Sequence, residues 1–286
     1  MKSKFAGIQY LGDSGVTQIC KEAVIQLIHA GEDIKDVKIL NFEEAYSHAH
    51  ALLLTLRYDI QVIVKGGFAS GYNGEAPKGY AFVLNLLRNY TDSINEYIIS
   101  ESIFERISNS SLTVKDLEYI NSIKPVRLAR WYDSAYLYKE REHNIFSEFP
   151  LTIPMALLDP RLIELALDFD KNPDNAIMGA YRKLESVVRE RTGLHNESST
   201  RLLKKAFQGD NSILYWENLN SGESIGRASL FSDIFMAYRN NRAHQEPRHN
   251  LGDDIREFML INQLFVLESE AVVRQRQVHK RNEVPN

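Results

Sequence analysis

The stretch 230-LFSDIFMAYRNNRAHQE-246 decides the predicted fold of the C-terminal half of the chain. Its apolar residues recur every three or four positions, which is the spacing expected for the buried face of an amphipathic helix. The residues predicted to face the core are Leu230, Ile234 and Ala237, with Phe231 and Tyr238 beside them. A helix that packs on the core through this face is rigid, so the residues at its C-terminal end are held in fixed positions.

A cluster of basic and amide side chains follows the apolar residues. It contains Arg239, Asn240, Arg242 and His244. In a continuous helix Asn240 and His244 stand one turn apart on one face, and the long side chain of Arg239 reaches the same space from the flank. The alternative interpretation is an ordinary helix end, where cations interact with the C-terminal dipole.

The residue types in this cluster suit the chemistry of phosphate. The planar guanidinium of arginine binds phosphate oxygens in pairs, and histidine moves protons near neutral pH. These groups are sufficient to cleave RNA through its own 2′-hydroxyl, with His244 handling a proton and Arg239 stabilising the charge on the phosphorane. No metal ion and no cofactor are expected for this reaction.

Further helical patterns surround the cluster. They span residues 160–170, 174–193, 198–208, 224–240 and 253–278. Gly193 is well placed to end the second of these helices in a left-handed conformation. Three prolines at 150, 154 and 160 mark a joint before the first helix. Several helices joined by short loops predict an all-α bundle over residues 151–286.

Three blocks of sequence in this bundle resemble a known superfamily. The blocks 180-AYRKLESVVRERTGL-194, 203-LKKAFQ-208 and 230-LFSDIFMAYRNNRAHQE-246, with a closing helix after them, resemble the Ymh-type branch of the HEPN superfamily. The resemblance covers residues 155–280. It implies an all-α bundle that usually dimerises. In many members it also implies a metal-independent endoribonuclease that acts as a toxin, a phage-defence effector or an RNA-processing enzyme.

The resemblance also carries residue roles. Arg239 and His244 match the Arg-x4-His motif of the family and would form the catalytic pair, in a site that both protomers of the dimer build. Asn240 is the polar residue that follows the arginine in active members. Those members often have proline next, whereas this chain has Asn241. Arg242 and Arg248 are predicted to contact RNA phosphates.

The first part of the chain has a different pattern. Strand-like runs at 5–11, 37–42 and 59–66 alternate with helical patterns at 15–31, 42–57 and 77–90. This alternation predicts a small α/β domain over residues 1–90. Residues 91–150 are predicted to form a helical connector, with helices at 93–108, 112–123 and 126–142. The predicted fold is therefore α+β overall.

A glycine-rich stretch, 65-KGGFASGYNGEAPKGYA-81, lies between a predicted strand and a predicted helix. Long loops of this kind often bind ligands, and five polar side chains are candidates for such contacts. They are Lys65, Tyr72, Asn73, Glu75 and Lys78. The alternative is a surface loop that needs glycine for its turns. The pair His48 and His50 lies in a predicted helix, where residues two apart cannot chelate one ion, so both are expected at the surface.

The composition sets limits on the class of protein. The net charge is −4, which disfavours a globally basic nucleic-acid binder. The single cysteine, Cys20, cannot form an intramolecular disulfide and fits a cytoplasmic setting. We find no signal-like start and no apolar run long enough to span a membrane.

These observations lead to two functional hypotheses. The first is a ribonuclease effector that dimerises through the C-terminal bundle, with an N-terminal module that responds to a ligand or a protein. The second is a non-catalytic module, in which the Arg-His cluster binds RNA, a phosphate-bearing ligand or a protein partner.

Overall fold

The computed structural model describes residues 4–43, 48–126, 134–135, 145–240, 242 and 250–274. Contacts within the chain divide it into two units, Met1–Pro150 and Leu151–Asn286. The buried residues that the structure describes form two hydrophobic cores in the N-terminal unit and one in the C-terminal unit. Among the described residues, no helix is long and apolar enough to cross a bilayer.

The N-terminal unit is built on a mixed five-stranded sheet. Its strands are β1 (Gln9–Leu11), β2 (Ile34–Glu43), β3 (His48–Leu56), β4 (Gln61–Ser70) and β5 (Ile94–Ile98), in the order β1-β4-β3-β2-β5. The three central strands form an antiparallel meander, and a short 3-10 turn, Arg57–Asp59, joins β3 to β4. The two outer strands pair in parallel, β1 with β4 and β5 with β2.

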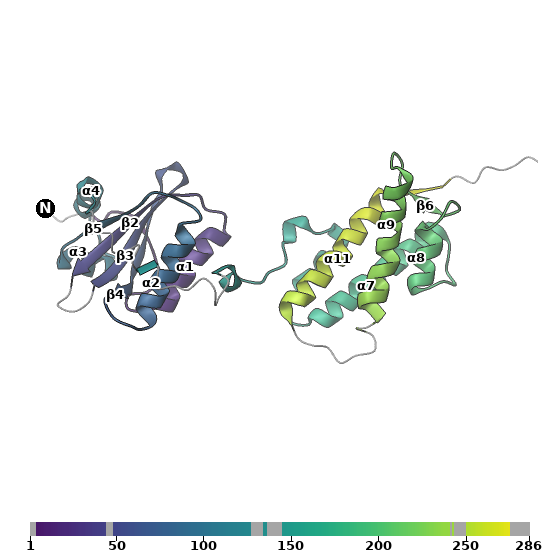
Figure 1. Cartoon of the computed structure of the whole chain (residues 1–286), viewed down its shortest axis with the longest axis horizontal. Coiled ribbons are helices and arrows are strands. Elements are labelled where there is room, and N and C mark those ends of the chain that lie inside the picture. The colour runs from purple at the N-terminus through teal and green to yellow at the C-terminus, as the bar shows by residue number, and fades with distance from the viewer. Residues whose placement is uncertain are drawn as a thin grey trace, which may run out of the picture. The chain divides into compact units, whose positions relative to one another are not determined.

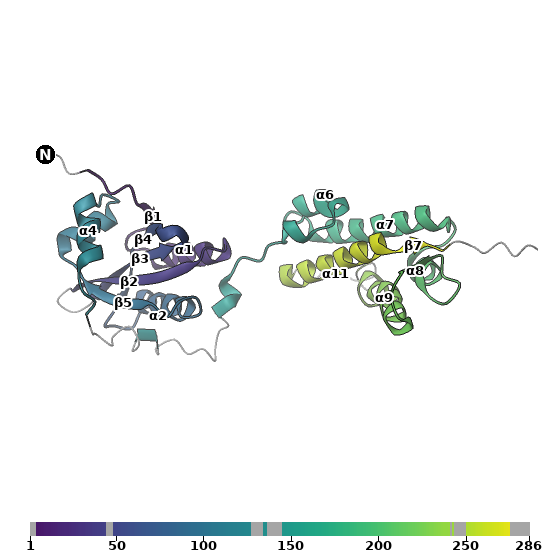
Figure 2. The same cartoon turned by 90° about the horizontal axis from the view of Figure 1, so that it is seen from above.

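Helices cover both faces of this sheet (Figures 1 and 2). Helices α1 (Thr17–His29) and α2 (Glu75–Leu87) pack on one face, and α3 (Glu101–Ser108) and α4 (Val114–Ser122) lie against the other. Because side chains alternate along a strand, neighbouring residues enter different cores. Leu52 is buried in the core under α1 and α2, while Leu53 is buried in the core under α3.

The predicted helix over residues 42–57 is wrong, since most of this stretch is strand β3. The run 51-ALLL-54 is buried on both faces of the sheet. A strand that is buried on both sides loses its polar-apolar alternation, so its sequence cannot be distinguished from that of a buried helix. The strands predicted at 37–42 and 59–66 and the helices predicted at 15–31 and 77–90 are confirmed as β2, β4, α1 and α2.

The region predicted as a helical connector also needs correction. Residues 94–98 form β5 rather than the start of a helix, and only α3 occupies the end of the predicted 93–108 segment. Helix α2 carries the chain back to this outer edge, so the sheet extends past residue 90. The helix predicted at 112–123 is confirmed as α4, which begins with a capping box formed by Thr113 and Asp116. Most of the predicted 126–142 helix lies outside the described residues.

The C-terminal unit is a helical bundle, as the periodicity predicted. Its helices are α6 (Ile163–Leu167), α7 (Pro173–Thr192), α8 (Ser199–Phe207), α9 (Ser221–Ile234) and α11 (Leu251–Glu270). Short 3-10 turns at Met155–Leu157 and Pro160–Leu162 precede α6, and the short strands β6 (Leu214–Tyr215) and β7 (Val272–Val273) pair with each other. Another 3-10 turn, Ile145–Glu148, belongs to the N-terminal unit.

Aromatic side chains from different helices fill the bundle core. Tyr181 of α7 meets Phe235 edge to face, and Phe207 of α8 stacks on Phe231 of α9. Helix α7 begins at Pro173 after the capping residue Asn172 and ends at Gly193, which has the predicted left-handed conformation. The long helices α7 and α11 lie side by side in both views (Figures 1 and 2).

Candidate functional site

Helix α9 leads directly into the predicted catalytic cluster. After Ile234 the helix widens into a π-helical turn, Phe235–Arg239, a rare form that often occurs at functional sites. The buried stripe of the helix consists of Ala228, Phe231 and Phe235. Arg239 and Arg242 follow this stripe at spacings of four and three residues, so both arginines continue the inward face.

The stripe predicted from the sequence was therefore displaced by about one residue. Phe231 and Ile234 are buried, but Leu230, Ala237 and Tyr238 are exposed. The larger phenylalanine side chains take the core positions, because Phe231 packs on Phe207 and Phe235 on Tyr181.

Arg242 is enclosed by three carboxylates from two other helices. It donates through Nη1 to Asp174 Oδ1 at 2.9 Å, and through Nη2 to Asp254 Oδ1 and Glu257 Oε2, both at 2.7 Å. Tyr181 completes the network by donating its hydroxyl to Glu257 Oε1 at 3.0 Å. Burial raises the pKa of Tyr181, as does the charge of Glu257, so the phenol stays protonated as a donor. The sequence assigned Arg242 to RNA phosphate, but here its donors hold the bundle together.

Arg239 has a different environment. Its Nη2 atom lies 3.6 Å from Glu185 Oε1, which is within the range of an ion pair but too long for a hydrogen bond. Its Nε atom is buried and has no hydrogen-bond partner among the described residues. The side chain is 27% exposed, so part of the guanidinium faces outward. Within the described part of the chain, Arg239 is thus positioned by the bundle while its Nε atom stays unpaired.

Glu185 lies between two arginines on the inner face of α7. Its Oε2 atom accepts a hydrogen bond from Arg189 Nη2 at 2.5 Å, and its Oε1 atom faces Arg239. The carboxylate is almost fully buried. The sequence analysis missed it, and also missed Asp174, Asp254 and Glu257. One signal was present, because Glu185 falls between Tyr181 and Val188 on the apolar stripe of α7, where a carboxylate needs a partner.

The remaining residues of the predicted cluster are only partly described. Asn240 continues the helix directly after Arg239 and is half-buried. His244 and Arg248 lie outside the described residues. The structure therefore describes Arg239, Asn240 and Arg242, and it places the two arginines in different environments.

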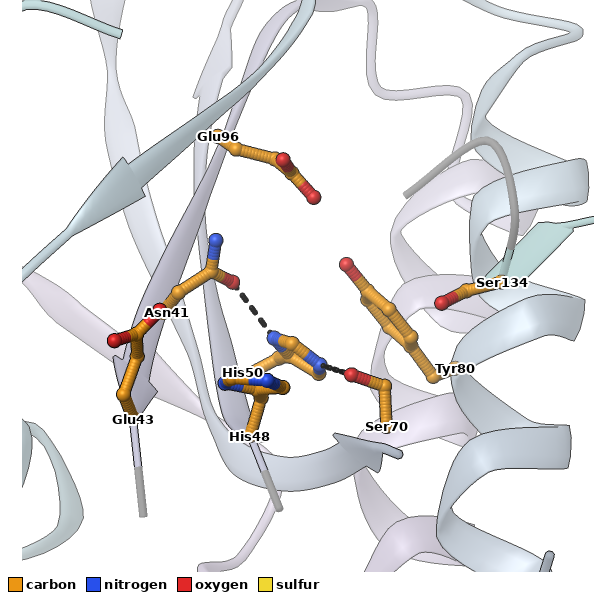
Figure 3. Close-up of a pocket in the computed structure, with 8 residues that line it drawn as sticks. All are labelled: Asn41, Glu43, His48, His50, Ser70, Tyr80, Glu96 and Ser134. Carbon is orange, nitrogen blue, oxygen red and sulfur yellow. Dashed lines mark hydrogen bonds between the residues drawn. The ribbon is translucent and has the colours of Figure 1, made fainter. Parts of the chain in front are cut away.

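The N-terminal unit contains a second candidate site, a polar pocket at one end of the sheet face that α1 and α2 cover (Figure 3). It has a volume of about 10 Å³, which is room for one group of the size of water. Its lining residues are Asn41, Glu43, His48, His50, Ser70, Tyr80, Glu96 and Ser134. The rest of this sheet face is apolar, so the polar residues are confined to one end.

His50 lies at the centre of this pocket. Its Nδ1 atom is 2.7 Å from Asn41 Oδ1, its Nε2 atom is 2.8 Å from Ser70 Oγ, and its ring stacks on Tyr80 at 4.1 Å between centroids. Burial lowers the pKa of His50 to about 3, with a smaller effect from His48. The imidazole is therefore neutral at physiological pH. One of its nitrogens donates and the other accepts.

The expected surface position of this histidine pair is wrong for His50, which is only 4% exposed. The reason is the change of element from helix to strand. Residues two apart point away from each other on a helix but share a face on a strand, so His48 and His50 both line the pocket.

The glycine-rich stretch is mostly regular structure rather than a loop. Residues 65–70 belong to β4 and residues 75–81 to α2. Two of the glycines allow close packing on α1. A Cβ atom on Gly67 would lie 2.5 Å from Cys20 Sγ, and one on Gly79 would lie 2.3 Å from Thr17 Cγ2. Cys20 itself is fully buried in the core.

The five candidate ligand contacts of this stretch do not gather at one place. Asn73, Glu75 and Lys78 line a groove between α1 and α2, together with Lys21 and Glu148, which form an ion pair at 3.1 Å. Lys65 lies in β4 and Tyr72 in the exposed turn after it, and neither lines this groove.

Comparison with known proteins identifies part of the C-terminal unit. Residues 161–265 match the family described as "Protein of unknown function (Hypoth_ymh)". No curated protein matches the chain. A solved chain described as "Respiratory complex I from Thermus thermophilus" aligns with 15% identity and a TM-score of 0.35, covering 43% of this chain and 99% of that chain. That likeness is too weak to indicate a shared fold or function.

Proposed function

We propose, from the premise that residues 161–265 form a Ymh-type domain, that the C-terminal unit cleaves RNA as an endoribonuclease effector. The observation that supports this proposal is the contrast between two arginines three residues apart. Arg242 has its donors bound by three carboxylates, whereas Arg239 is held by one loose ion pair and its buried Nε has no partner among the residues that the structure describes. An arginine held in this way suits the binding of an incoming phosphate.

The proposed reaction is attack of a ribose 2′-hydroxyl on the adjacent phosphorus. A bond forms from the 2′-oxygen to phosphorus, and the bond from phosphorus to the 5′-oxygen breaks. A base takes the proton of the 2′-hydroxyl, and an acid delivers a proton to the leaving 5′-oxygen. The products carry a 2′,3′-cyclic phosphate and a 5′-hydroxyl. We assign His244 to proton transfer, on the resemblance to HEPN ribonucleases.

Arg239 would stabilise the negative charge that builds on the phosphorane oxygens. Its loose partner Glu185 holds the guanidinium in place before RNA binds. Because the Nη2–Oε1 separation is 3.6 Å, turning a donor from Glu185 to a phosphate breaks no hydrogen bond. Asn240, the next residue on the helix, supplies a polar amide close to the same space.

Two further parts of the proposal follow from the HEPN resemblance. The site is completed by a second copy of the chain, so the active form is a homodimer that pairs through the C-terminal bundle. The N-terminal unit regulates the nuclease in response to a ligand or a protein, as in a toxin or phage-defence effector.

The test is cleavage of total RNA and tRNA by the purified full-length chain in the presence of EDTA. The wild type is compared with Arg239→Ala, His244→Ala and, as a matched control, Arg256→Ala, which removes an exposed arginine of the same unit. Both site variants are expected to lose on the order of 10²–10³ of the rate, while Arg256→Ala keeps it. Circular dichroism checks that each variant is folded.

The outcomes separate the competing hypotheses. Cleavage that yields 2′,3′-cyclic phosphate ends and disappears in both site variants supports the ribonuclease. Cleavage that persists in those variants places the chemistry elsewhere. A shift of RNA in a gel without cleavage, lost in Arg239→Ala, favours the non-catalytic binding module instead.

A further inference from the structure

The C-terminal unit contains a groove that is separate from the proposed ribonuclease site. It is lined by the end of α8, the segment around β6, the first half of α9 and Arg274, which follows β7. Its volume is about 680 Å³, which is within the range of small-molecule sites. The last lining residue on α9 is Ala228, so Arg239 lies about 16 Å farther along the helix axis.

Aromatic and apolar side chains form the walls of this groove. Trp216 stacks on Phe207 with 5.4 Å between the ring centroids, and its indole N–H donates to Leu267 O at 2.8 Å. Phe207 stacks in turn on Phe231 of α9, so these rings are fixed by the bundle core. Ile225 of α9 contributes an exposed apolar side chain to the groove. A wall of this kind suits a flat ring.

Arg274 is held over the ring of Tyr215. Its Cζ atom lies 4.5 Å from the ring centroid, its Nε atom donates to Ser212 O at 3.0 Å, and its backbone N–H donates to Ile213 O at 2.7 Å. The side chain is exposed, and among the described residues its Nη1 atom has no hydrogen-bond partner. The guanidinium is therefore fixed in direction and still has donors for a ligand.

A carboxylate lies at the hydroxyl end of the same tyrosine. The Tyr215 hydroxyl donates to Glu217 Oε1 at 3.4 Å, and a second carboxylate, Asp210, also lines the groove. Within the described part of the chain, neither Arg274 nor Glu217 forms an ion pair. One tyrosine ring therefore separates a set of donors from a set of acceptors, and the two sets do not pair with each other.

This arrangement of donors and acceptors defines the chemical class of the ligand. A phosphate group would meet the charges of Asp210 and Glu217, so a neutral ring is the better match. Arginine only donates hydrogen bonds, and a carboxylate only accepts them. Guanine has two acceptors on one edge, O6 and N7, and two adjacent donors on another edge, N1–H and N2–H. Adenine, cytosine and uracil do not have two adjacent donors on a ring edge.

We propose that this groove binds a guanine base, with O6 and N7 accepting from Arg274, N1–H and N2–H donating to Glu217, and the ring against the aromatic and apolar wall. The base belongs either to a free nucleoside or to single-stranded RNA, and its binding does not depend on cleavage. In RNA, the groove would read a base some distance from the phosphate at Arg239, and this last point rests on the proposed ribonuclease function.

The experiment measures the binding of fluorescein-labelled 2′-O-methyl RNA to the full-length chain by fluorescence anisotropy. The methyl group removes the nucleophile of the proposed cleavage reaction, so binding is measured by itself. One probe is a uracil strand of about nine nucleotides, and the other has a single guanine at its centre. The guanine probe is expected to bind about tenfold more tightly, because a bidentate contact to a base contributes a factor of this order.

Free nucleosides distinguish the two sources of the base. Guanosine and uridine compete with the guanine probe, each at about 1 mM. Displacement by guanosine and not by uridine would show that the base alone is sufficient for binding. A guanine preference of the probes that guanosine does not reduce would show that the groove reads the base within a strand.

Variants locate the preference for guanine. Arg274→Lys keeps the charge but loses the planar pair of donors, and Glu217→Gln loses part of the acceptor pair. Both are expected to bring the affinity of the guanine probe close to that of the uracil probe. Arg256→Lys is the matched control, since Arg256 is exposed and pairs with Asp253 outside the groove. It is expected to keep the preference.

Arg239→Ala separates this proposal from the proposed ribonuclease function. It removes the phosphate-binding arginine and is expected to leave the tenfold preference between the probes unchanged. A preference that Arg239→Ala abolishes and Arg274→Lys retains would instead place the base at the ribonuclease site and overturn the proposal.

Equal binding of the two probes, or no binding of either, would also contradict a guanine site. So would a preference that both Arg274→Lys and Glu217→Gln retain. A probe with 7-deazaguanine, which lacks the N7 acceptor, tests the arginine contact on the wild-type chain. Its affinity is expected to fall toward that of the uracil probe, and an undiminished affinity counts against the proposal even where a variant fails to fold.

Discussion

Arg239 and Arg242 show how strongly the role of a residue depends on partners that are distant in sequence. Both follow the buried stripe of α9, and in the sequence both belong to one cluster of cations. Arg242 meets Asp174 of α7 and both Asp254 and Glu257 of α11, whereas among the described residues Arg239 forms an ion pair with Glu185 alone. The number of nearby carboxylates therefore distinguishes the two arginines. Three of them bind Arg242 within the bundle, whereas the single long ion pair of Arg239 leaves it better able to bind a ligand.

Arg242→Ala is expected to destabilise the C-terminal unit by about 3 kcal/mol, because Asp254 and Glu257 stay buried after their cation is removed. Urea unfolding followed by helical circular dichroism measures the change. Arg256→Ala removes an exposed partner of Asp253 and is expected to cost less than about 0.5 kcal/mol. Equal effects from the two substitutions would contradict the network described here.

His50 should make the N-terminal unit sensitive to acid. Its pKa is about 3 in the folded protein and about 6.5 in the unfolded chain, so between these values the unfolded state binds more protons. The stability it contributes is fully present above about pH 6.5 and decreases as the pH falls toward 3. Between pH 7 and pH 5 the expected loss is about 2 kcal/mol.

Urea titrations of the wild type and of His50→Gln at pH 7 and pH 5 measure this effect. The glutamine still reaches Asn41 and Ser70 with a donor and an acceptor, but it does not titrate. The pH dependence of the variant should therefore be weaker by that amount. An unchanged pH dependence in the variant would show that other groups control the acid sensitivity.

At the scale of elements, the sequence predicted correctly those segments that have one buried apolar face and one exposed polar face. Helix α7 has an apolar stripe, an asparagine cap, proline at its first position and glycine at its end. Strand β3 has no polar face because helices cover both sides of the sheet, and its sequence therefore resembled that of a helix. Strand β5 is only five residues long and lies just before α3, so the sequence analysis placed both in one predicted helix, 93–108.

Two glycines of the C-terminal unit allow a paired test of backbone conformation. Both have open space where a Cβ atom would lie, but Gly193 has φ of +71° at the end of α7, whereas Gly226 lies within α9. Gly193→Ala is expected to destabilise the unit by about 1 kcal/mol, and Gly226→Ala to stabilise it by about 0.5–1 kcal/mol. Thermal unfolding of the two variants should shift in opposite directions. A shift in the same direction would mean that local backbone strain does not govern these positions.

At the scale of the whole molecule, the chain consists of two units with separate cores. The bundle buries its aromatic residues within residues 158–271, and the sheet buries its own within residues 20–145. Each core is formed by residues of its own unit, as expected for a domain that can fold by itself.

Residues 151–286 are accordingly expected to fold without the rest of the chain. Circular dichroism should show a helical protein with a cooperative melting transition. If the N-terminal unit restrains the proposed ribonuclease, this fragment cleaves RNA faster than the full-length chain. A fragment that is unfolded in isolation would contradict the assignment of two independent cores.

The sequence by itself determined the helical bundle, both ends of α7, and the presence of Arg239 and Asn240 at the end of the buried stripe of α9. These features depend on residues within a few positions of one another, and their spacing and caps are local. The helix predicted over 253–278 was too long, because α11 ends at Glu270 and β7 follows it. Tertiary structure alone decided that His50 is buried on a strand and that Tyr80 and Glu96 line one pocket. It also decided that Arg242 is bound by three carboxylates, whereas Arg239 forms one long ion pair with Glu185. Burial on two faces and pairing of charges depend on which distant segments pack together, and no local pattern in the chain encodes that.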